Sequence, residues 1–417
     1  MNRMHRRLSA TAALAMGGFC LPVAATAGEV TWWAPNWEQP RVNQIIEDFQ
    51  AEYPDIKVNL ETTVAEGLQN KILVALQSGS PPDVIDSQNG WNIPFAAQGL
   101  LSPIDELMAD KDLDWSDFLD SGLATTKYDG AVYGLPYRIE SHAVIINRGM
   151  FRDAGLDPDN PPQTWDEFAE AAKALTKTRE DGTEQYGFAI TGGGEFGNTV
   201  YRSVPFLRMN GGGILDADGK VVVNTSESVA GLKFYTDFYT DLKTSPPSTL
   251  ENDGIANRQL FSAGAVAMYQ SGQYDLATIH KENPDIETGS IMLPHPEGKD
   301  TTALLGGWNW IVPADAPNKE DAATLLAYLA RPEVMGVYTD TFPARDSAMS
   351  QPRFQDPELK AFRDMLPYAR APWPVPNWTQ MTQTYFTYVQ EVLVGSMEPQ
   401  EAMDAAAEEI EPLTEGQ

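Results

Sequence analysis

Strand and helix patterns alternate near the start of the chain, and this alternation restricts the possible folds more than any other feature. Short β-type runs at 29–33, 56–60 and 82–86 are separated by stretches at 39–53 and 67–78 in which apolar residues recur at helical spacing. A β-α-β-α-β order predicts a parallel sheet with crossover helices. Ligands of such sheets bind beyond the carboxyl ends of the strands.

The loops expected at those strand ends combine hydrogen-bonding groups with aromatic rings. One loop follows the first strand at 34–38 and another follows the third strand at 87–91, and each carries a tryptophan. Aromatic rings in polar loops suit sugars, because C–H-rich pyranose faces stack on rings while sugar edges form hydrogen bonds.

The N-terminus has the pattern of a secretory signal peptide. A basic region at 3–7 precedes an apolar, alanine-rich run at 10–23 and a small-x-small cleavage site at 25–27. A membrane anchor is the alternative, but the apolar run is short for a bilayer core of ~30 Å. We therefore expect cleavage after Ala27, which assigns 1–27 to the signal peptide and the mature protein to the periplasm.

Composition excludes several function classes for the mature chain. It lacks cysteine, so neither disulfides nor a thiolate metal site are expected. Removing the three arginines of the signal peptide takes the formal charge from −30 to −33, which disfavours nucleic acid and anionic lipid as partners. The remaining histidines show no metal-binding spacing and no nucleophile motif occurs, so we expect no metal, no cofactor and no catalytic residue.

A glycine-rich segment at 192–197 matches G-x-G-x-x-G, but it lies deep in the chain and no acidic residue closes a second strand at the distance that dinucleotide binding requires. The preferred interpretation is a loop that lets Glu195 and Phe196 approach a ligand. A second motif, Asp216-x-Asp218-Gly219, lacks the distal glutamate of a calcium loop and predicts a turn instead.

The stretch 128–151 places a charged pair, Arg138 and Glu140, between β-type runs at 131–136 and 143–147. Such a pair is costly unless it faces a cleft or a partner. One interpretation is a surface loop with an incidental pair. The other is a hinge crossing beside a polar ligand pocket.

This stretch resembles the extracellular solute-binding proteins of ABC importers, the maltose-binding-like family that captures sugars. The family pattern YxGxxYGLPY is nearly intact at 128–137, whereas Ile146-Asn147-Arg148 stands where Tyr-Asn-Lys is usual. Further blocks similar to the family occur in the family's order at 82–105, 164–168, 265–272, 306–312, 320–330 and 343–345.

The resemblance implies an α/β, two-lobed periplasmic binding protein fold with discontinuous lobes and an interlobe ligand cleft. The N-terminal lobe would hold 28–138 and 291–341, and the C-terminal lobe would hold 139–290 and 342–417. Glu140 would stand at the position of a sugar-binding carboxylate, and Tyr274 where a cleft tryptophan is usual. The implied ligand-binding residues are Asn36, Trp37, Glu38, Gln88, Asn89, Trp91, Tyr137, Arg138, Glu140, Glu195, Phe196, Tyr274, Gly307, Trp308, Asn309, Arg345 and Trp378.

The implied function is capture of a sugar, either a mono-, di- or oligosaccharide or a sugar derivative, by hinge closure of a monomer. The bound sugar would pass to the permease subunits of an ABC importer. A secreted carbohydrate-active enzyme is the alternative, because it would share the export signal, the acidity and the aromatic residues. An adhesion protein should show repeats, and none stands out. Arg138 and Arg345 leave an anionic ligand open.

Overall fold

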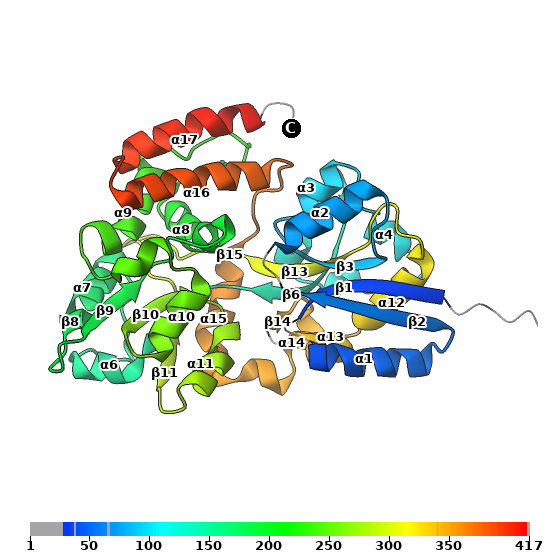
Figure 1. Ribbon diagram of the computed structural model, residues 1–417, viewed down its shortest axis with the longest axis horizontal. Helices are drawn as coiled ribbons and strands as arrows, with labels where there is room; N and C mark the ends of the chain where they lie inside the picture. The colour runs from blue at the N-terminus through cyan, green and yellow to red at the C-terminus, as the bar shows by residue number, and fades with distance from the viewer. Residues whose placement is uncertain (1–27, 37–38, 65–66, 340, 415–417) are drawn as a thin grey trace, which may run out of the picture.

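The computed structural model describes residues 28–36, 39–64, 67–339 and 341–414, and these residues form two α/β lobes that lie side by side (Figure 1). The first lobe is built on a six-stranded sheet and the second lobe on a five-stranded sheet. The fold class expected from the sequence is therefore confirmed.

The sheet of the first lobe has the strand order β14-β6-β13-β3-β1-β2. β1 is parallel to β2 and β3, whereas β13 is antiparallel to both β3 and β6. The carboxyl ends of β3 and β6 therefore lie at the same edge of the sheet. The strands are β1 (Gly28–Pro35), β2 (Ile56–Thr63), β3 (Val84–Gln88), β6 (Leu135–Glu140), β13 (Gly306–Ile311) and β14 (Phe342–Pro343).

Helices cover this sheet with their apolar faces. In α1 (Gln39–Glu52) the helically spaced Val42, Ile45, Ile46 and Phe49 are all buried, as the spacing predicts. The other helices of this part are α2 (Leu68–Ser78), α3 (Asn92–Ala97), α4 (Ile104–Leu107), α5 (Asp120–Leu123), α12 (Lys319–Leu329), α13 (Pro332–Tyr338) and α14 (Asp346–Met349). A small hairpin joins β4 (Lys127–Tyr128) to β5 (Ala131–Val132).

The sheet of the second lobe has the order β11-β7-β10-β9-β8. Its strands are β7 (Ala143–Asn147), β8 (Lys177–Thr178), β9 (Glu184–Ala189), β10 (Val266–Ser271) and β11 (Thr288–Ile291). The surrounding helices are α6 (Arg148–Asp153), α7 (Trp165–Leu175), α8 (Phe196–Met209), α9 (Ser226–Thr240), α10 (Gly254–Ser262), α11 (Leu276–Glu282), α15 (Lys360–Met365), α16 (Trp378–Val394) and α17 (Pro399–Thr414).

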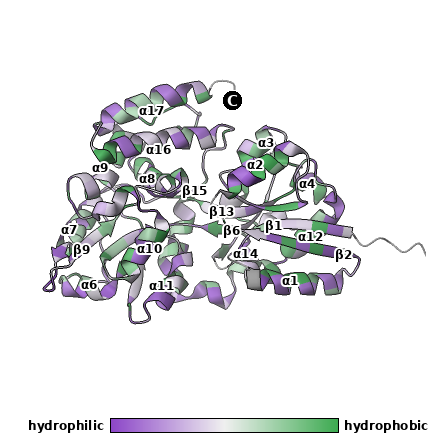
Figure 2. Cartoon of the chain, in the orientation of Figure 1, coloured by the Kyte–Doolittle hydropathy of each residue, from purple (hydrophilic) through white to green (hydrophobic). Residues whose placement is uncertain are grey.

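Local sequence signals explain several of these elements. Thr164 and Glu167 form the predicted capping box at the start of α7, which satisfies backbone N–H groups that the first helical turn leaves free. Figure 2 shows hydrophilic and hydrophobic residues interspersed along the helices of both lobes, as expected where one helix face packs on a sheet. Within the described residues, no helix has the length and apolar character needed to cross a membrane.

Both lobes take strands from distant parts of the chain. The first sheet recruits β13 and β14, and a short parallel pair, β12 (Ala303–Leu304) with β15 (Ala369–Arg370), lies between the main sheets (Figure 1). β14 pairs with β6, so Phe342–Pro343 belongs to the first sheet. The lobe boundaries predicted from the sequence had placed residues 342–417 in the second lobe. The lobe boundaries as a whole remain a prediction.

Candidate functional site

Side chains from both lobes meet where the carboxyl ends of β3 and β6 face α8. The antiparallel register of β13 sets Trp308 opposite Gln88 and Gly306 opposite Glu140, which gathers these residues at one sheet edge. Hydrogen bonds then join this edge to the second lobe. They run from Tyr201 Oη to Asn89 Oδ1 (2.9 Å), from Gln69 Nε2 to Thr379 Oγ1 (3.2 Å) and from the Gly67 amide to Glu195 Oε1 (3.1 Å).

A void of about 40 Å³ lies between the lobes. Among the residues predicted from the sequence, it brings together Gln88 and Trp91 of the first lobe with Glu195, Phe196 and Trp378 of the second. A void of this size holds about one water molecule rather than a sugar. The lobes are therefore closed against each other in this conformation.

Arg138 and Glu140 form a buried ion pair beside this junction. Both residues lie on one face of β6, since side chains alternate along a strand. The Arg138 guanidinium lies 5.9 Å from the ring centre of Tyr274. The hydroxyl of Tyr274 lies 3.3 Å from Nε2 of His142, so a chain of polar groups connects the two lobes.

Burial controls the protonation of these groups. Desolvation, with Arg202 adding to it, holds the pKa of His142 well below its ordinary value, so the imidazole is neutral. Desolvation also raises the pKa of Tyr274 and of Tyr201, and the Glu140 carboxylate contributes to both. The tyrosines therefore stay protonated and can donate hydrogen bonds.

Four side chains of the second lobe are buried with polar atoms that have no hydrogen-bond partner among the described residues. We call Thr199, His142, Gln270 and Gln273 the second-lobe polar cluster; each is at most 6% exposed. The unpartnered atoms are Thr199 Oγ1, His142 Nδ1 and both carboxamide atoms of each glutamine. Leaving such a group unpaired costs roughly 1–3 kcal/mol, so the cluster needs an explanation.

Arg202 ties this cluster to α8. Its Nε donates to the carbonyl oxygen of Gln270 at 3.1 Å and its Nη1 donates to that of Asn198 at 2.9 Å. The sequence analysis missed the cluster, although Gln273 directly precedes Tyr274 and His142 stands two residues after Glu140. The sequence neighbourhood could have suggested Gln273 and His142 as site residues. Whether their polar atoms have hydrogen-bond partners, however, can be seen only in the folded chain.

Several predicted residues have partners inside the first lobe. Tyr137 is fully buried, donates from its hydroxyl to Asp86 at 3.0 Å and stacks on Trp310. Arg345 pairs with Asp117 at 2.6 Å and also donates to the carbonyl oxygen of Ala330. Asn309 is buried and its amide lies 3.4 Å from the Thr125 hydroxyl. These contacts explain the residues structurally, without a ligand.

The remaining predicted residues lie near the junction between the lobes, at the end of β1, or outside the residues that the structure describes. Trp308 packs edge-on against Trp91, and the backbone amide of Asn89 donates to the carbonyl oxygen of Gly307. Asn36 is exposed just after β1. Trp37 and Glu38 lie outside the described residues.

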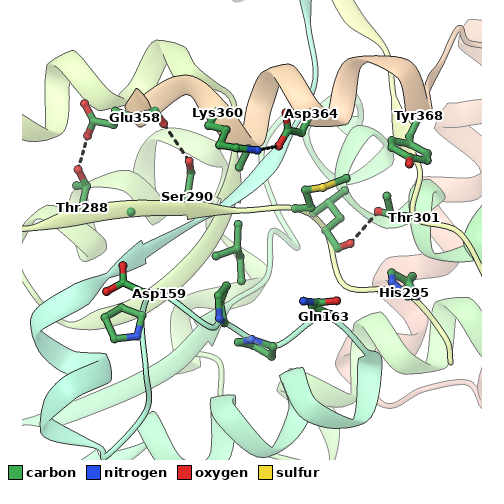
Figure 3. Close-up of a pocket in the computed structure, with 18 of the residues that line it drawn as sticks. Asp159, Gln163, Thr288, Ser290, His295, Thr301, Glu358, Lys360, Asp364 and Tyr368 are labelled. Atoms are coloured by element: carbon green, nitrogen blue, oxygen red, sulfur yellow. Dashed lines mark hydrogen bonds and ion pairs between the residues drawn. The ribbon is translucent and has the colours of Figure 1, made fainter. Parts of the chain in front are cut away.

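A larger hollow, of about 1010 Å³, lies on the second lobe beside β11 rather than between the lobes (Figure 3). Several of its polar groups already have partners. Lys360 pairs with Asp364, Ser290 donates to the carbonyl oxygen of Glu358, and Thr301 donates to that of Leu293. None of the buried, unpartnered side-chain atoms of the described residues lies in its lining, so its volume alone does not indicate a site.

The described part of the chain contains no group of three or more His, Cys, Asp or Glu residues that could hold a metal ion. The junction instead offers hydroxyls, carboxamides, indoles and one ion pair. Such groups bind polar organic ligands through hydrogen bonds and ring stacking.

Two α/β lobes with hydrogen-bonding groups that meet at a common junction define a two-lobed binding protein. Residues 36–336 match the family model of the bacterial extracellular solute-binding proteins, and the chain belongs to this family. The predicted resemblance is thereby confirmed. The family serves ABC transporters as binding proteins rather than as enzymes, which favours the predicted function over the secreted-enzyme alternative.

Individual relatives agree with this assignment. A putative binding protein of Brucella abortus (strain 2308) is 28% identical over 398 residues, covering 93% of this chain and 94% of that protein. The sn-glycerol-3-phosphate-binding periplasmic protein UgpB of Brucella suis is 28% identical over 328 residues, covering 74% and 72%. A solute-binding protein of Thermotoga lettingae, solved with α-D-tagatose, is 29% identical with a TM-score of 0.83, covering 93% of this chain and all of that one.

Proposed function

We propose that the mature protein captures a sugar or sugar-derived molecule between its lobes in the periplasm and delivers it, chemically unchanged, to the permease of an ABC importer. One observation carries this proposal: buried second-lobe polar groups without partners lie beside a junction at which both lobes contribute hydrogen bonds. The family membership and the tagatose bound by a relative of 29% identity support it.

In this proposal the ligand contacts come from both lobes. The first lobe contributes Gln88, Asn89, Trp91, Arg138, Glu140 and the Gly307–Trp308 segment, and the second lobe contributes Glu195, Phe196, Tyr274, Trp378 and the second-lobe polar cluster. Because each lobe holds only part of this set, ligand binding favours the closed arrangement over the open one. A permease that distinguishes these two arrangements then recognises the loaded protein.

The remaining predictions belong to the same proposal. Cleavage after Ala27 would release the mature chain into the periplasm, and the protein would act as a monomer. The formal charge of −30 for the full chain supports the expectation that it does not bind nucleic acid.

X-ray scattering with and without sugar tests the proposal. At saturating ligand we expect a smaller radius of gyration, because closure brings the lobes together. Mass spectrometry of the released ligand should show it intact. Scattering that does not change at saturation contradicts hinge capture, whereas a cleaved sugar supports the secreted-enzyme alternative.

A further inference from the structure

Helix α2 of the first lobe begins without a cap from its own side chains. It follows Gly67, which has a left-handed backbone conformation (φ 71°) and no side chain, and no acidic residue stands in its first turn. The first turn of a helix leaves backbone N–H groups unpaired and carries a partial positive charge. A helix end of this kind attracts a carboxylate from elsewhere in the molecule.

Glu195 of the second lobe supplies that carboxylate. Its Oε1 accepts a hydrogen bond from the Gly67 amide at 3.1 Å, although 128 positions separate the two residues in the sequence. In a capping box, a glutamate makes this bond to the residue that precedes its own helix. Glu167 does so at the start of α7, where it accepts from the Thr164 amide at 3.1 Å. At α2 the glutamate comes from the other lobe.

We infer that Glu195 is an interlobe latch: it caps α2 only when the lobes are closed, and it thereby gives the ligand-free chain a closed population. The inference rests on the proposed function, because it concerns the same closure of the two lobes. It gives Glu195 a positioning role that needs no ligand, in addition to the ligand contact that the resemblance implies.

The Glu195 side chain has no competing role in its own lobe. It does not cap α8, the helix that it precedes, and it forms no ion pair with any described residue. Opening of the lobes would therefore exchange the α2 contact for water. Since the contact exists only on closure, it supplies part of the closing free energy.

The glycine-rich segment before Glu195 holds the carboxylate in place. A Cβ atom on Gly193 would lie 2.5 Å from the backbone of Glu251, and one on Gly194 would lie 2.6 Å from Cβ of Asp253. Gly194 also has a φ of 78°, a left-handed conformation that favours glycine. The segment therefore packs closely on its own lobe, which explains these two glycines without a bound nucleotide.

The same end of α2 makes a second contact with the other lobe. Gln69, in the first turn of α2, donates from Nε2 to Oγ1 of Thr379 at 3.2 Å, and Thr379 lies in the first turn of α16. Gln69, Glu195 and Thr379 all line the void of about 40 Å³ between the lobes. Both hydrogen bonds join lobe to lobe directly, so neither requires a ligand.

Fluorescence energy transfer in single ligand-free molecules tests the latch. A chain that starts at Gly28 has no cysteine, so Val74→Cys and Ile255→Cys place one dye in each lobe, at side chains that are 67% and 57% exposed. We expect a closed and an open population. In Glu195→Ala the ratio of closed to open molecules should fall roughly three- to tenfold. In Glu195→Gln, which keeps an acceptor without the charge, the ratio should fall less.

Two further variants separate the latch from a change in net charge. Glu251 is an exposed acid of the same lobe whose side chain forms no hydrogen bond with a described residue, so Glu251→Ala should leave the ratio unchanged. Asn70→Glu acts from the first lobe: it places a carboxylate in the first turn of α2, which neutralises the helix end without the other lobe. The ratio should then fall although Glu195 is intact.

The possible outcomes are distinct. A ligand-free chain that is open in all molecules, or an unchanged ratio in Glu195→Ala, overturns the latch and leaves the proposed function in place. Equal losses in Glu195→Ala and Glu251→Ala also overturn it, because the effect would then follow net charge. An unchanged ratio in Asn70→Glu excludes the α2 helix end as the target of Glu195. Closure that depends on Glu195, without compaction by sugar in the scattering experiment, supports the latch and contradicts the proposed function.

Discussion

Two buried polar clusters, one in each lobe, show how differently a chain can use polar groups in its interior. In the first lobe, the Asp86 carboxylate accepts hydrogen bonds from the indole of Trp32 at 2.8 Å and from the hydroxyls of Tyr137 and Tyr338. In the second-lobe polar cluster, the carboxamides of Gln270 and Gln273 have no such partners among the described residues.

The difference lies in what completes each cluster. The Asp86 network is completed by its own chain, so its polar groups stabilise the fold. The second-lobe polar cluster is buried without such partners among the described residues, and in the proposed function the bound ligand supplies them. Changes in the first cluster should therefore alter stability, and changes at the interlobe site should alter binding.

The largest effect is expected from Asp86→Ala. This change leaves three buried donors without an acceptor, and we expect the free energy of unfolding to fall by ~3–5 kcal/mol in urea titrations. Asp218→Ala is the control, because Asp218 is exposed in a turn and its loss should change stability by less than ~0.5 kcal/mol. Equal stability of the two variants would show that the Asp86 network does not support the fold.

The same carboxylate predicts a pH dependence. Burial raises the pKa of Asp86 from 3.8 to about 7, against the lowering effect of its hydrogen-bond donors. The folded protein then keeps a proton that the unfolded chain loses near pH 4, so Asp86 contributes stability at low pH and loses that contribution as the pH rises to about 7.

Asp86→Asn isolates this contribution, because the amide does not titrate. The unfolding free energy of the wild type minus that of Asp86→Asn should decrease steadily between pH 4 and pH 7. A difference that is constant, or that grows with pH, would mean that the folded carboxyl has an ordinary or lowered pKa.

Glu140→Ala tests the interlobe side of the comparison. If Glu140 accepts charge-assisted hydrogen bonds from the ligand, the change should weaken sugar binding by roughly 1.5–3 kcal/mol in calorimetric titrations. Glu140→Gln is the companion variant, since it keeps an acceptor for Arg138 and should show a smaller loss of affinity. Wild-type sugar affinity in a folded Glu140→Ala protein would exclude Glu140 from the site.

The sequence predicted the fold well because the signals for strands and helices are local. Apolar spacing located α1, and the capping box located the start of α7. The rule that ligands bind beyond parallel strands located Gln88 and Trp91, which do lie at the interlobe void. These features depend on short stretches of chain, so one sequence is enough to reveal them.

The rest of the site depends on which side chains meet in space. Tyr137 adjoins Arg138 in sequence, but the register of β6 against β13 shifts between Pro136 and Arg138, and the Tyr137 side chain enters the Asp86 network. The second-lobe polar cluster is defined by missing partners, and no spacing of residues in the sequence encodes whether a buried glutamine has a neighbour to bond.

The smallest predicted effect concerns the contact between the lobes. The Tyr201 hydroxyl donates to Asn89 Oδ1 across the junction at 2.9 Å, so it stabilises the closed arrangement and not the open one. Tyr201→Phe should weaken ligand binding by ~0.5–1.5 kcal/mol. The variant lacks the hydrogen bond that favours closure, so more of the ligand's binding free energy is used to close the lobes. Tyr385→Phe is the matched control, since the Tyr385 hydroxyl donates to Ser203 within the second lobe. It should lower stability and leave affinity unchanged. If both variants keep wild-type affinity, the Tyr201–Asn89 hydrogen bond does not contribute to closure, and the ligand alone must hold the lobes together.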